Sequence, residues 1–339
     1  MTSRRGILAA LEEATDFLSG ETLASSLGIS RAAVWKHISA LKAGGYEIEG
    51  VRARGYRLIA SPSSLSPSAI RSRCPDGRLG RRIVSLEVTR STNSDAMALG
   101  REGEPEGTVV LAEEQTAGRG RLGRTWESSR GVNLYASILL RPGVEPHKAP
   151  QLSLLAGVAV AETVREEGVE AGIKWPNDVV VPRVQADGST TLVKLAGILT
   201  EIEAEADRVS FVVVGIGVNL NSERAHFSPE LADRATSVLL ETGRKVDRTA
   251  FTARLLVRFE ECYDAWLAGG FAAVAPRWRS KSVLEGRALV VTSPGEEFRG
   301  NCAGIDDDGA LLVDTGGPSP RRVLAGDVTI SGGYVPCHP

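Results

Sequence analysis

The chain has 339 residues, of which 42% are hydrophobic and 24% are charged, and its formal net charge is -2. This composition excludes a disordered chain, and the small net charge means that any contact with nucleic acid must be local. The length predicts two or three domains rather than one. No apolar run is long enough to span a bilayer and the first residues lack a signal-peptide pattern, so we expect a cytoplasmic protein with no membrane partner.

The first part of the chain, residues 6–58, shows the pattern of short helices followed by a hairpin. Apolar residues repeat at helical spacing in three stretches, the last of which begins at Val34. Gly28 supplies a turn before that stretch and Ser30 is a good N-cap, which together are typical of a helix-turn-helix. Two short strands around a tip at residues 50–55 would form a wing.

The third helix and the wing carry cationic side chains that suit contacts with phosphates and base edges. The candidate DNA-binding residues are Ser30, Arg31, Trp35, Lys36, His37, Arg52 and Arg54. The segment is only mildly basic, so a monomer should bind weakly and in a salt-sensitive way, and a two-fold dimer that reads two half-sites is the expected form. A winged helix used for protein contacts is the alternative.

The remaining chain divides by composition and periodicity. A stretch rich in serine and proline predicts a linker. Strands then mix with helices, which predicts an α+β domain with a mixed sheet, because several strands follow one another without room for a crossover helix. Short strands alone near the end predict a small β-barrel. The expected domains are a winged helix-turn-helix at 1–60, a linker at 61–67, the α+β domain at 68–282 and the barrel at 283–333.

A loop with alternating glycine and arginine, GRGRLGRTW at residues 118–126, directly follows a predicted strand. Its glycines satisfy GxGxxG, but no helix-forming run follows, and Leu139 and Leu140 stand where a ribose-binding acid would be needed. Backbone amides and guanidinium groups at this spacing can close over a carboxylate and a phosphate together. We therefore predict an anion clamp; the alternative, a solvated basic loop, is disfavoured because Trp126 and an apolar strand follow.

Three further motifs are weak when taken singly: KWPND from Lys174, KLAGIL from Lys194 and GIGVN from Gly215. An Asn-Asp pair is usually a turn, and a lysine at the start of a strand is usually solvated. Glycines in a strand either weaken it or mark the close approach of a ligand to the backbone.

Together with Ser91-Thr92-Asn93 and the helix-turn-helix segment at residues 6–58, here called the head, these motifs resemble the family of bifunctional biotin–protein ligases and biotin operon repressors. The resemblance covers nearly the whole chain. The resemblance implies a biotin/lipoate-ligase-like central domain and an SH3-like barrel. It implies that biotin attacks ATP, with Mg²⁺ present, to give biotinyl-5′-AMP, and that a lysine of biotin carboxyl carrier protein then takes the biotin. It further implies that the adenylate is the corepressor of a homodimer on operator DNA.

The same resemblance assigns roles to residues. The catalytic residues would be Lys194, Arg119 and Arg121, and the metal ligand would be Asp178. The biotin-binding residues would be Ser91, Thr92, Asn93, Gln115, Gly118, Arg119, Gly120, Arg121, Lys194 and Gly197. The nucleotide-binding residues would be Arg121, Arg124, Trp126, Lys174, Asn177 and Asn219. Lys194 is the first choice for catalysis because an ammonium beside the carboxylate and the α-phosphate would stabilise charge that develops in the transition state.

The sequence departs from the family at two places. Residues 182–191 form a polar, turn-rich insertion, which we interpret as a hairpin tip, and the wing at residues 52–54 resembles the family only loosely. Two alternatives to the bifunctional enzyme stay open: a ligand-sensing repressor without ligase activity, and a ligase for another acyl cofactor such as lipoate.

Overall fold

The computed structural model describes most of the chain. The described residues are 3–14, 16–43, 46–51, 54–60, 65–74, 76–185, 190–205, 208–293 and 295–330. The chain divides into two compact units, Met1–Ser64 and Leu65–Pro339. Among the described helices, none has the length and apolar character that crossing a membrane requires.

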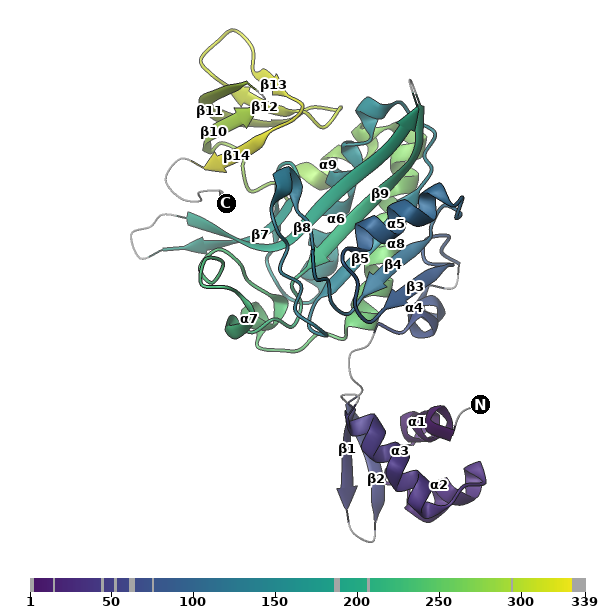
Figure 1. Cartoon of the computed structure of the whole chain (residues 1–339). Coiled ribbons are helices and arrows are strands. Elements are labelled where there is room, and N and C mark those ends of the chain that lie inside the picture. Colours follow the sequence, from purple (N-terminus) through teal and green to yellow (C-terminus); the bar gives the residue numbers. More distant parts are fainter. Residues whose placement is uncertain are drawn as a thin grey trace. The chain divides into compact units, whose positions relative to one another are not determined.

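The first unit is a winged helix-turn-helix, as predicted (Figure 1). Its elements are α1 (Ser3–Glu13), α2 (Gly20–Leu27), α3 (Arg31–Ala43), β1 (Glu47–Val51) and β2 (Gly55–Ala60). Gly28 ends α2 with a φ of 64°, and the hydroxyl of Ser30 accepts from the backbone N–H of Ala33 at 3.2 Å. The apolar stripes of the helices meet in one small core that contains Ile7, Leu11, Leu23, Ala24, Val34, Ile38, Leu41 and Ile48.

The second unit is built on a mixed sheet of seven strands, in the order β3-β4-β5-β9-β8-β7-β6. The strands are β3 (Ile83–Leu86), β4 (Val109–Ala112), β5 (Leu134–Leu140), β6 (Gly172–Lys174), β7 (Asp178–Val184), β8 (Thr190–Glu205) and β9 (Arg208–Val218). Only the β3–β4 pair is parallel among these neighbours, and α5 (Thr92–Arg101) forms its crossover. The mixed sheet predicted from the sequence is therefore confirmed.

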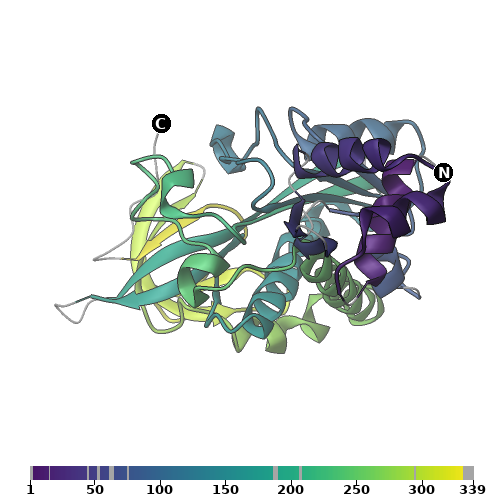
Figure 2. The same ribbon diagram turned by 90° about the horizontal axis from the view of Figure 1, so that it is seen from below.

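Helices cover both faces of this sheet. One face packs against α6 (Gln151–Glu166) and α8 (Arg248–Gly269) through a large core, and Figure 2 shows these two helices on the same side of the sheet. The other face packs against α5 through a smaller core that contains Val110, Leu139 and Val213. The faces differ because alternate residues of a strand point to opposite sides. Three short helices were not predicted: α4 (Pro67–Arg73), α7 (Val238–Thr242) and α9 (Ala275–Arg279).

The C-terminal part of the second unit is a five-stranded antiparallel sheet in the order β13-β12-β11-β10-β14. Its strands are β10 (Ala288–Ser293), β11 (Glu296–Ile305), β12 (Leu311–Asp314), β13 (Arg321–Val323) and β14 (Asp327–Ile330). The first four agree with the short strands that the sequence predicts at residues 287–292, 297–305, 310–314 and 322–324. The last, β14, was not predicted because four residues after a glycine give little periodic pattern.

The boundary between the units falls inside the predicted linker. Residues 61–64 lie outside the described part of the chain, but Leu65 is buried and its N–H donates to Glu113 Oε1 at 2.9 Å. Glu113 also forms a buried ion pair with Arg248 at the start of α8. The second unit therefore begins with an anchored residue; the four-part division of the chain stays a prediction.

The predicted hairpin at the insertion is confirmed on both sides of its tip. Strands β7 and β8 pair as far as Val184 and Thr190, with one register shift between Val179 and Val180. Residues 186–189 lie outside the described part of the chain.

Candidate active site

A cavity of about 390 Å³ opens on the α5 face of the large sheet. The cavity brings together every residue predicted for the ligand site except Gly118. The predicted residues that line it are Ser91, Thr92, Asn93, Gln115, Arg119, Gly120, Arg121, Arg124, Trp126, Lys174, Asn177, Asp178, Lys194, Gly197 and Asn219. Gly118 lies beneath Trp126, where a Cβ would be 2.5 Å from the Trp126 carbonyl oxygen.

Lys194 and Asp178 form an ion pair in this cavity, with 2.6 Å between Nζ and Oδ1. Lys194 lies on β8 at the point where β9 has ended, and residues 234–236 take the place of β9 as its hydrogen-bonding neighbour. The Lys194 backbone is therefore held on both sides, and the ion pair with Asp178 positions its ammonium group. Lys174 on β6 lies opposite Asp178 in the strand register.

The charges of this group alter one another's protonation. Burial raises the pKa of Asp178, but the ammonium groups of Lys194 and Lys174 lower it by more, so it lies below its ordinary value. Burial lowers the pKa of Lys174 from 10.5 to about 8, although Asp178 acts in the opposite direction. At pH 7 Lys174 therefore keeps its proton and Asp178 is ionised.

Asp327 of β14 holds two arginines of the glycine-rich loop, and sequence analysis missed it. Its carboxylate accepts from Arg121 Nη1 at 3.2 Å and from Arg124 Nη2 at 2.5 Å. Arg121 also donates to Asn177 Oδ1 at 3.2 Å. A lone aspartate after a glycine gives no signal in the sequence, because its partners stand about two hundred residues away along the chain.

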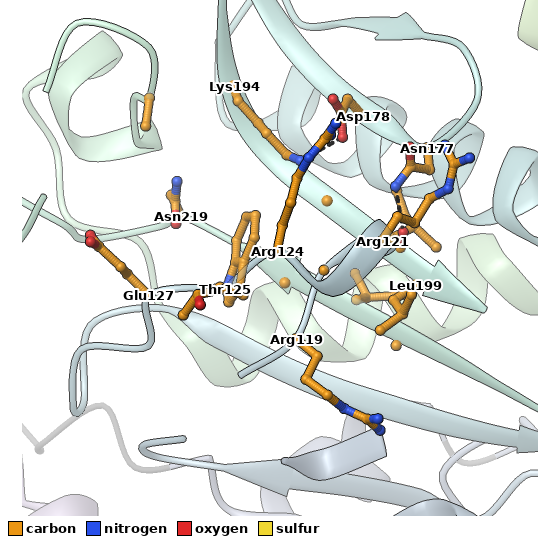
Figure 3. Close-up of a pocket in the computed structure, with 18 of the residues that line it drawn as sticks. Arg119, Arg121, Arg124, Thr125, Glu127, Asn177, Asp178, Lys194, Leu199 and Asn219 are labelled. Carbon is orange, nitrogen blue, oxygen red and sulfur yellow. Dashed lines mark hydrogen bonds and ion pairs between the residues drawn. The ribbon is translucent and has the colours of Figure 1, made fainter. Parts of the chain in front are cut away.

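Four cations and two carboxylates therefore converge on one end of the cavity, among the residues that the structure describes. Figure 3 shows the side chains of Lys194, Arg124 and Asp178 pointing toward one another, with Arg121 beside Asn177. The excess of positive charge in a partly enclosed space favours an anionic ligand.

Trp126 packs flat against glycines of the sheet. A Cβ on Gly217 would lie 2.6 Å from Trp126 Cε2, and one on Gly197 would lie 3.0 Å from its Cζ3. Gly197 and Gly217 stand directly opposite each other on β8 and β9. Lys194 Nζ lies 5.5 Å from the centroid of the Trp126 ring. Gly197 and Gly217, one from each strand motif, are thus explained by the close approach of an aromatic ring of the protein itself.

Asn93 fills a second gap in the same face of the sheet. A Cβ on Gly215 would lie only 2.1 Å from Asn93 Oδ1. The two N–H groups of Asn93 Nδ2 donate to the Leu199 carbonyl at 3.1 Å and to Glu201 Oε2 at 2.8 Å, and Oδ1 accepts from Ser137 at 2.6 Å. Both side-chain donors of Asn93 are therefore used within the protein, so this residue shapes the cavity wall.

The buried Thr92 and the half-buried Gln115 form a polar group next to Asn93. Gln115 Oε1 accepts from the backbone N–H of Thr92 at 2.9 Å and from its hydroxyl at 3.1 Å. Gln115 Nε2 donates to Ser128 Oγ at 2.9 Å. Ser91, the N-cap of α5, makes no cap hydrogen bond through its side chain and lines the cavity. This end of the cavity thus presents neutral hydroxyl and amide groups, in contrast to the charged end.

Arg119 behaves differently from the other loop arginines. Its guanidinium donates to Ser94 Oγ at 3.2 Å and to Glu201 Oε2 at 3.0 Å. Figure 3 shows its side chain pointing away from the group around Lys194 and Asp178. Asn219, the last predicted residue of the cavity, is buried, and its Oδ1 accepts from Asn133 Nδ2 at 3.4 Å.

The candidate DNA-binding residues lie on α3 and the wing. Arg31, Trp35 and Lys36 are exposed, and Trp35 keeps 65% of its surface accessible. His37 is half-buried, and Arg54 forms an ion pair with Asp16 at 3.2 Å. Arg52 lies outside the described residues.

Within the described part of the chain, no cluster of three or more His, Cys, Asp or Glu side chains could hold a metal ion. Asp178, the predicted metal ligand, is instead surrounded by the ammonium groups of two lysines. Any divalent cation here would therefore take most of its oxygen ligands from a bound phosphate and water.

Three regions of the chain match known families. Residues 85–219 match the Biotin/lipoate A/B protein ligase family, residues 4–57 an HTH domain, and residues 286–330 the Biotin protein ligase C terminal domain. The fold and the site define a ligase that carries a helix-turn-helix head.

Two bacterial proteins are similar to this chain over more than nine-tenths of its length. The Bifunctional ligase/repressor BirA of Bacillus subtilis is 39% identical over 331 residues, which cover 97% of this chain and 99% of the relative. The BirA of Escherichia coli is 33% identical and covers 91% of this chain and 92% of the relative. The chain therefore belongs to the family of bifunctional ligase/repressor proteins.

A solved structure agrees with this assignment for the second unit. The biotin protein ligase from Aquifex aeolicus in complex with biotin and ATP is 28% identical, with a TM-score of 0.61. The match covers 74% of this chain and 98% of that protein.

Proposed function

We propose that this chain activates biotin with ATP, transfers it to a lysine of a biotin carrier protein, and represses transcription when it holds the activated intermediate. The observation that carries the enzymatic part is the convergence of Lys194, Lys174, Arg121 and Arg124 on one cavity. The family assignment, with relatives named as ligase and repressor together, supports both parts.

In the first step, a biotin carboxylate oxygen attacks the α-phosphorus of ATP, the mixed anhydride forms, and pyrophosphate leaves. Two anionic reactants must approach each other, so their repulsion is a large part of the barrier. Lys194 would stabilise the charge that develops between the carboxylate and the α-phosphate. Arg121 and Arg124 would hold the phosphates, and Asp178 would keep the Lys194 ammonium in place.

Biotin itself would occupy the neutral end of the cavity. Ser91, Thr92 and Gln115 would bind its polar ring, and the loop backbone at Gly120 would lie over its chain. The nucleotide would lie beside Trp126, Asn177 and Asn219, which line the cavity near the cationic group.

In the second step, the amine of the carrier lysine attacks the acyl carbon and AMP leaves. The mixed anhydride also reacts with water, so the loop at residues 118–126 has a second role in covering it. Arg121, which is held between Asn177 and Asp327, is suited to keep that cover in place.

Mg²⁺ would enter this site with ATP and neutralise part of the phosphate charge, with Asp178 as the candidate protein ligand. Regulation would follow if the bound adenylate favours a homodimer whose two heads read operator half-sites.

The direct test supplies the purified chain with biotin, MgATP and a biotin carrier domain. We expect pyrophosphate release that depends on biotin, and labelling of one carrier lysine. Absence of both would contradict the ligase. The same assay with lipoate in place of biotin, or with the two in competition, distinguishes a biotin ligase from a ligase for another acyl cofactor. A gel-shift titration in which the adenylate leaves operator affinity unchanged would contradict the regulatory part alone.

A further inference from the structure

Glu201 on β8 lies behind the cavity wall, where it binds two residues of the lining, and the sequence analysis did not single it out. Its Oε2 accepts from Asn93 Nδ2 at 2.8 Å and from Arg119 Nη2 at 3.0 Å. Asn93 belongs to α5 and Arg119 to the glycine-rich loop. One carboxylate therefore joins the sheet, the helix that lines the neutral end of the cavity, and the loop that covers it.

The glycine-rich loop is folded on itself, so that a tether at one residue restrains the rest. The Gly120 N–H donates to the Arg124 carbonyl at 2.7 Å, and the Trp126 N–H donates to the Gly118 carbonyl at 2.9 Å. On the charged side, Arg124 is tied to Asp327. On the neutral side, Arg119 is the loop residue whose side chain reaches α5 and β8.

Arg119 is placed for restraint rather than for contact with the reacting atoms. Its guanidinium points away from Lys194 and Asp178 in Figure 3, and it also donates to Ser94 on α5. A charge-assisted hydrogen bond from a fixed strand restricts an otherwise flexible glycine-rich segment. About half of the Arg119 side chain and 27% of that of Glu201 are exposed, so solvent screens the pair and a moderate effect is expected.

We propose that Glu201 is a positioning residue of the ligase reaction: by binding Arg119 and Asn93 together, it closes the loop over the biotin end of the cavity. This inference rests on the proposed function, since biotin is the ligand that the closed loop would retain. Without the charge of Glu201, the loop opens more often, biotin binds more weakly and the adenylate escapes sooner.

The variant Glu201→Gln tests this with little change in shape, because it keeps an acceptor oxygen and removes the charge. Glu203→Gln is its matched control: Glu203 is two residues further along the same face of β8, and its partner Arg101 does not line the cavity, unlike Asn93 and Arg119. Glu201→Asp is the conservative variant, which keeps the charge and should recover part of the wild-type behaviour.

Three experiments are made on each full-length variant: steady-state kinetics, the half-life of the bound adenylate, and trypsin cleavage. We expect Glu201→Gln to raise the KM for biotin by about 5- to 10-fold and to leave kcat for pyrophosphate release within about twofold. The half-life of the enzyme-held adenylate, followed without carrier, should shorten by a similar factor. Trypsin should cleave the ligand-free protein faster after Arg119, Arg121 and Arg124. Glu203→Gln should match the wild type in all three.

An unchanged or lower KM for biotin in Glu201→Gln, with an unchanged half-life of the adenylate, would overturn the proposal. Equal effects in Glu203→Gln would also overturn it, since they would come from strand charge alone. A general loss of structure would instead lower kcat and the melting temperature together. If the wild-type chain released no pyrophosphate with biotin and MgATP, the proposed function would fail. The trypsin cleavage rates of wild type and Glu201→Gln would still show whether Glu201 restrains the loop.

Discussion

The ammonium of Lys194 and the carboxylate of Asp178 lie 2.6 Å apart in the floor of the cavity, on two adjacent strands. Lys174 stands opposite Asp178 on the next strand. Two ammonium groups thus share one carboxylate, which leaves a net positive charge directed at the space where a carboxylate and a phosphate would meet.

Asp327→Asn should raise the KM for ATP by about tenfold. Asp327 orders Arg121 and Arg124 through charge-assisted hydrogen bonds, and a neutral amide holds guanidinium groups less firmly. Steady-state pyrophosphate release measures the effect. Glu297→Gln, which removes an exposed carboxylate from the same C-terminal sheet, should leave this KM unchanged. An unchanged or lower KM in Asp327→Asn would contradict the role given to Asp327.

Gly215→Ala should destabilise the second unit and weaken biotin binding. The added methyl group would lie 2.1 Å from Asn93 Oδ1, so Asn93 must move and its three hydrogen bonds must break or rearrange. Overpacking of this kind costs about 1–3 kcal/mol. Denaturant unfolding and the KM for biotin are the measurements.

The control for that substitution is Gly157→Ala on α6. A Cβ there would lie 3.5 Å from Ile173, which is an ordinary contact, and alanine favours a helix interior over glycine. It should unfold at the same or a higher denaturant concentration than the wild type. If both alanine variants lost the same stability, the special fit of Asn93 against Gly215 would be refuted.

The buried Lys174 should make stability depend on pH in the alkaline range. Its pKa is about 8 in the folded protein and 10.5 ordinarily, so between those values the unfolded chain binds a proton that the folded protein has lost. The free energy of unfolding should therefore rise through this window relative to Lys174→Met, by at most about 1.4 kcal/mol per pH unit, and run parallel to it below about pH 8. Lys245 is exposed, and Lys245→Met is the control. If the free energy of unfolding of the wild type rose by the same amount relative to Lys245→Met, the assignment to Lys174 would be contradicted.

Lys36→Ala should weaken binding of the whole chain to duplex DNA and reduce its salt dependence. An exposed lysine of α3 that neutralises one phosphate releases about one counterion, so the slope of log affinity against log salt should fall by about 1. Fluorescence anisotropy with a random-sequence duplex measures this slope. The same slope in Lys36→Ala and wild type would show that α3 does not face the phosphates.

Local patterns predicted most elements but not the contacts that complete the site. Helical spacing at Val34 and the turn at Gly28 suffice for the head, because these signals are local. The loop and the two lysine motifs were recognised because each keeps its residues adjacent in sequence. Asp327 and Glu201 carry no local pattern, since each acts only through arginines that the fold brings to it.

The sequence left two explanations open for strand glycines: a weakened strand, or the close approach of a ligand to the backbone. In β8 and β9 the glycines do mark a close approach, but the groups that approach in the structure are Trp126 and Asn93 of the protein itself. Periodicity cannot identify these partners, because both come from segments far away in the sequence.

The central claim is that Lys194 stabilises the transition state of biotin activation, and single-turnover pyrophosphate release by Lys194→Ala tests it most directly. With saturating biotin and MgATP, and with Lys148→Ala as an exposed-lysine control, we predict a rate about 10²- to 10³-fold below wild type. The melting temperature should stay close to that of the control. A folded Lys194→Ala variant that activates biotin within about twofold of the wild-type rate would contradict the account.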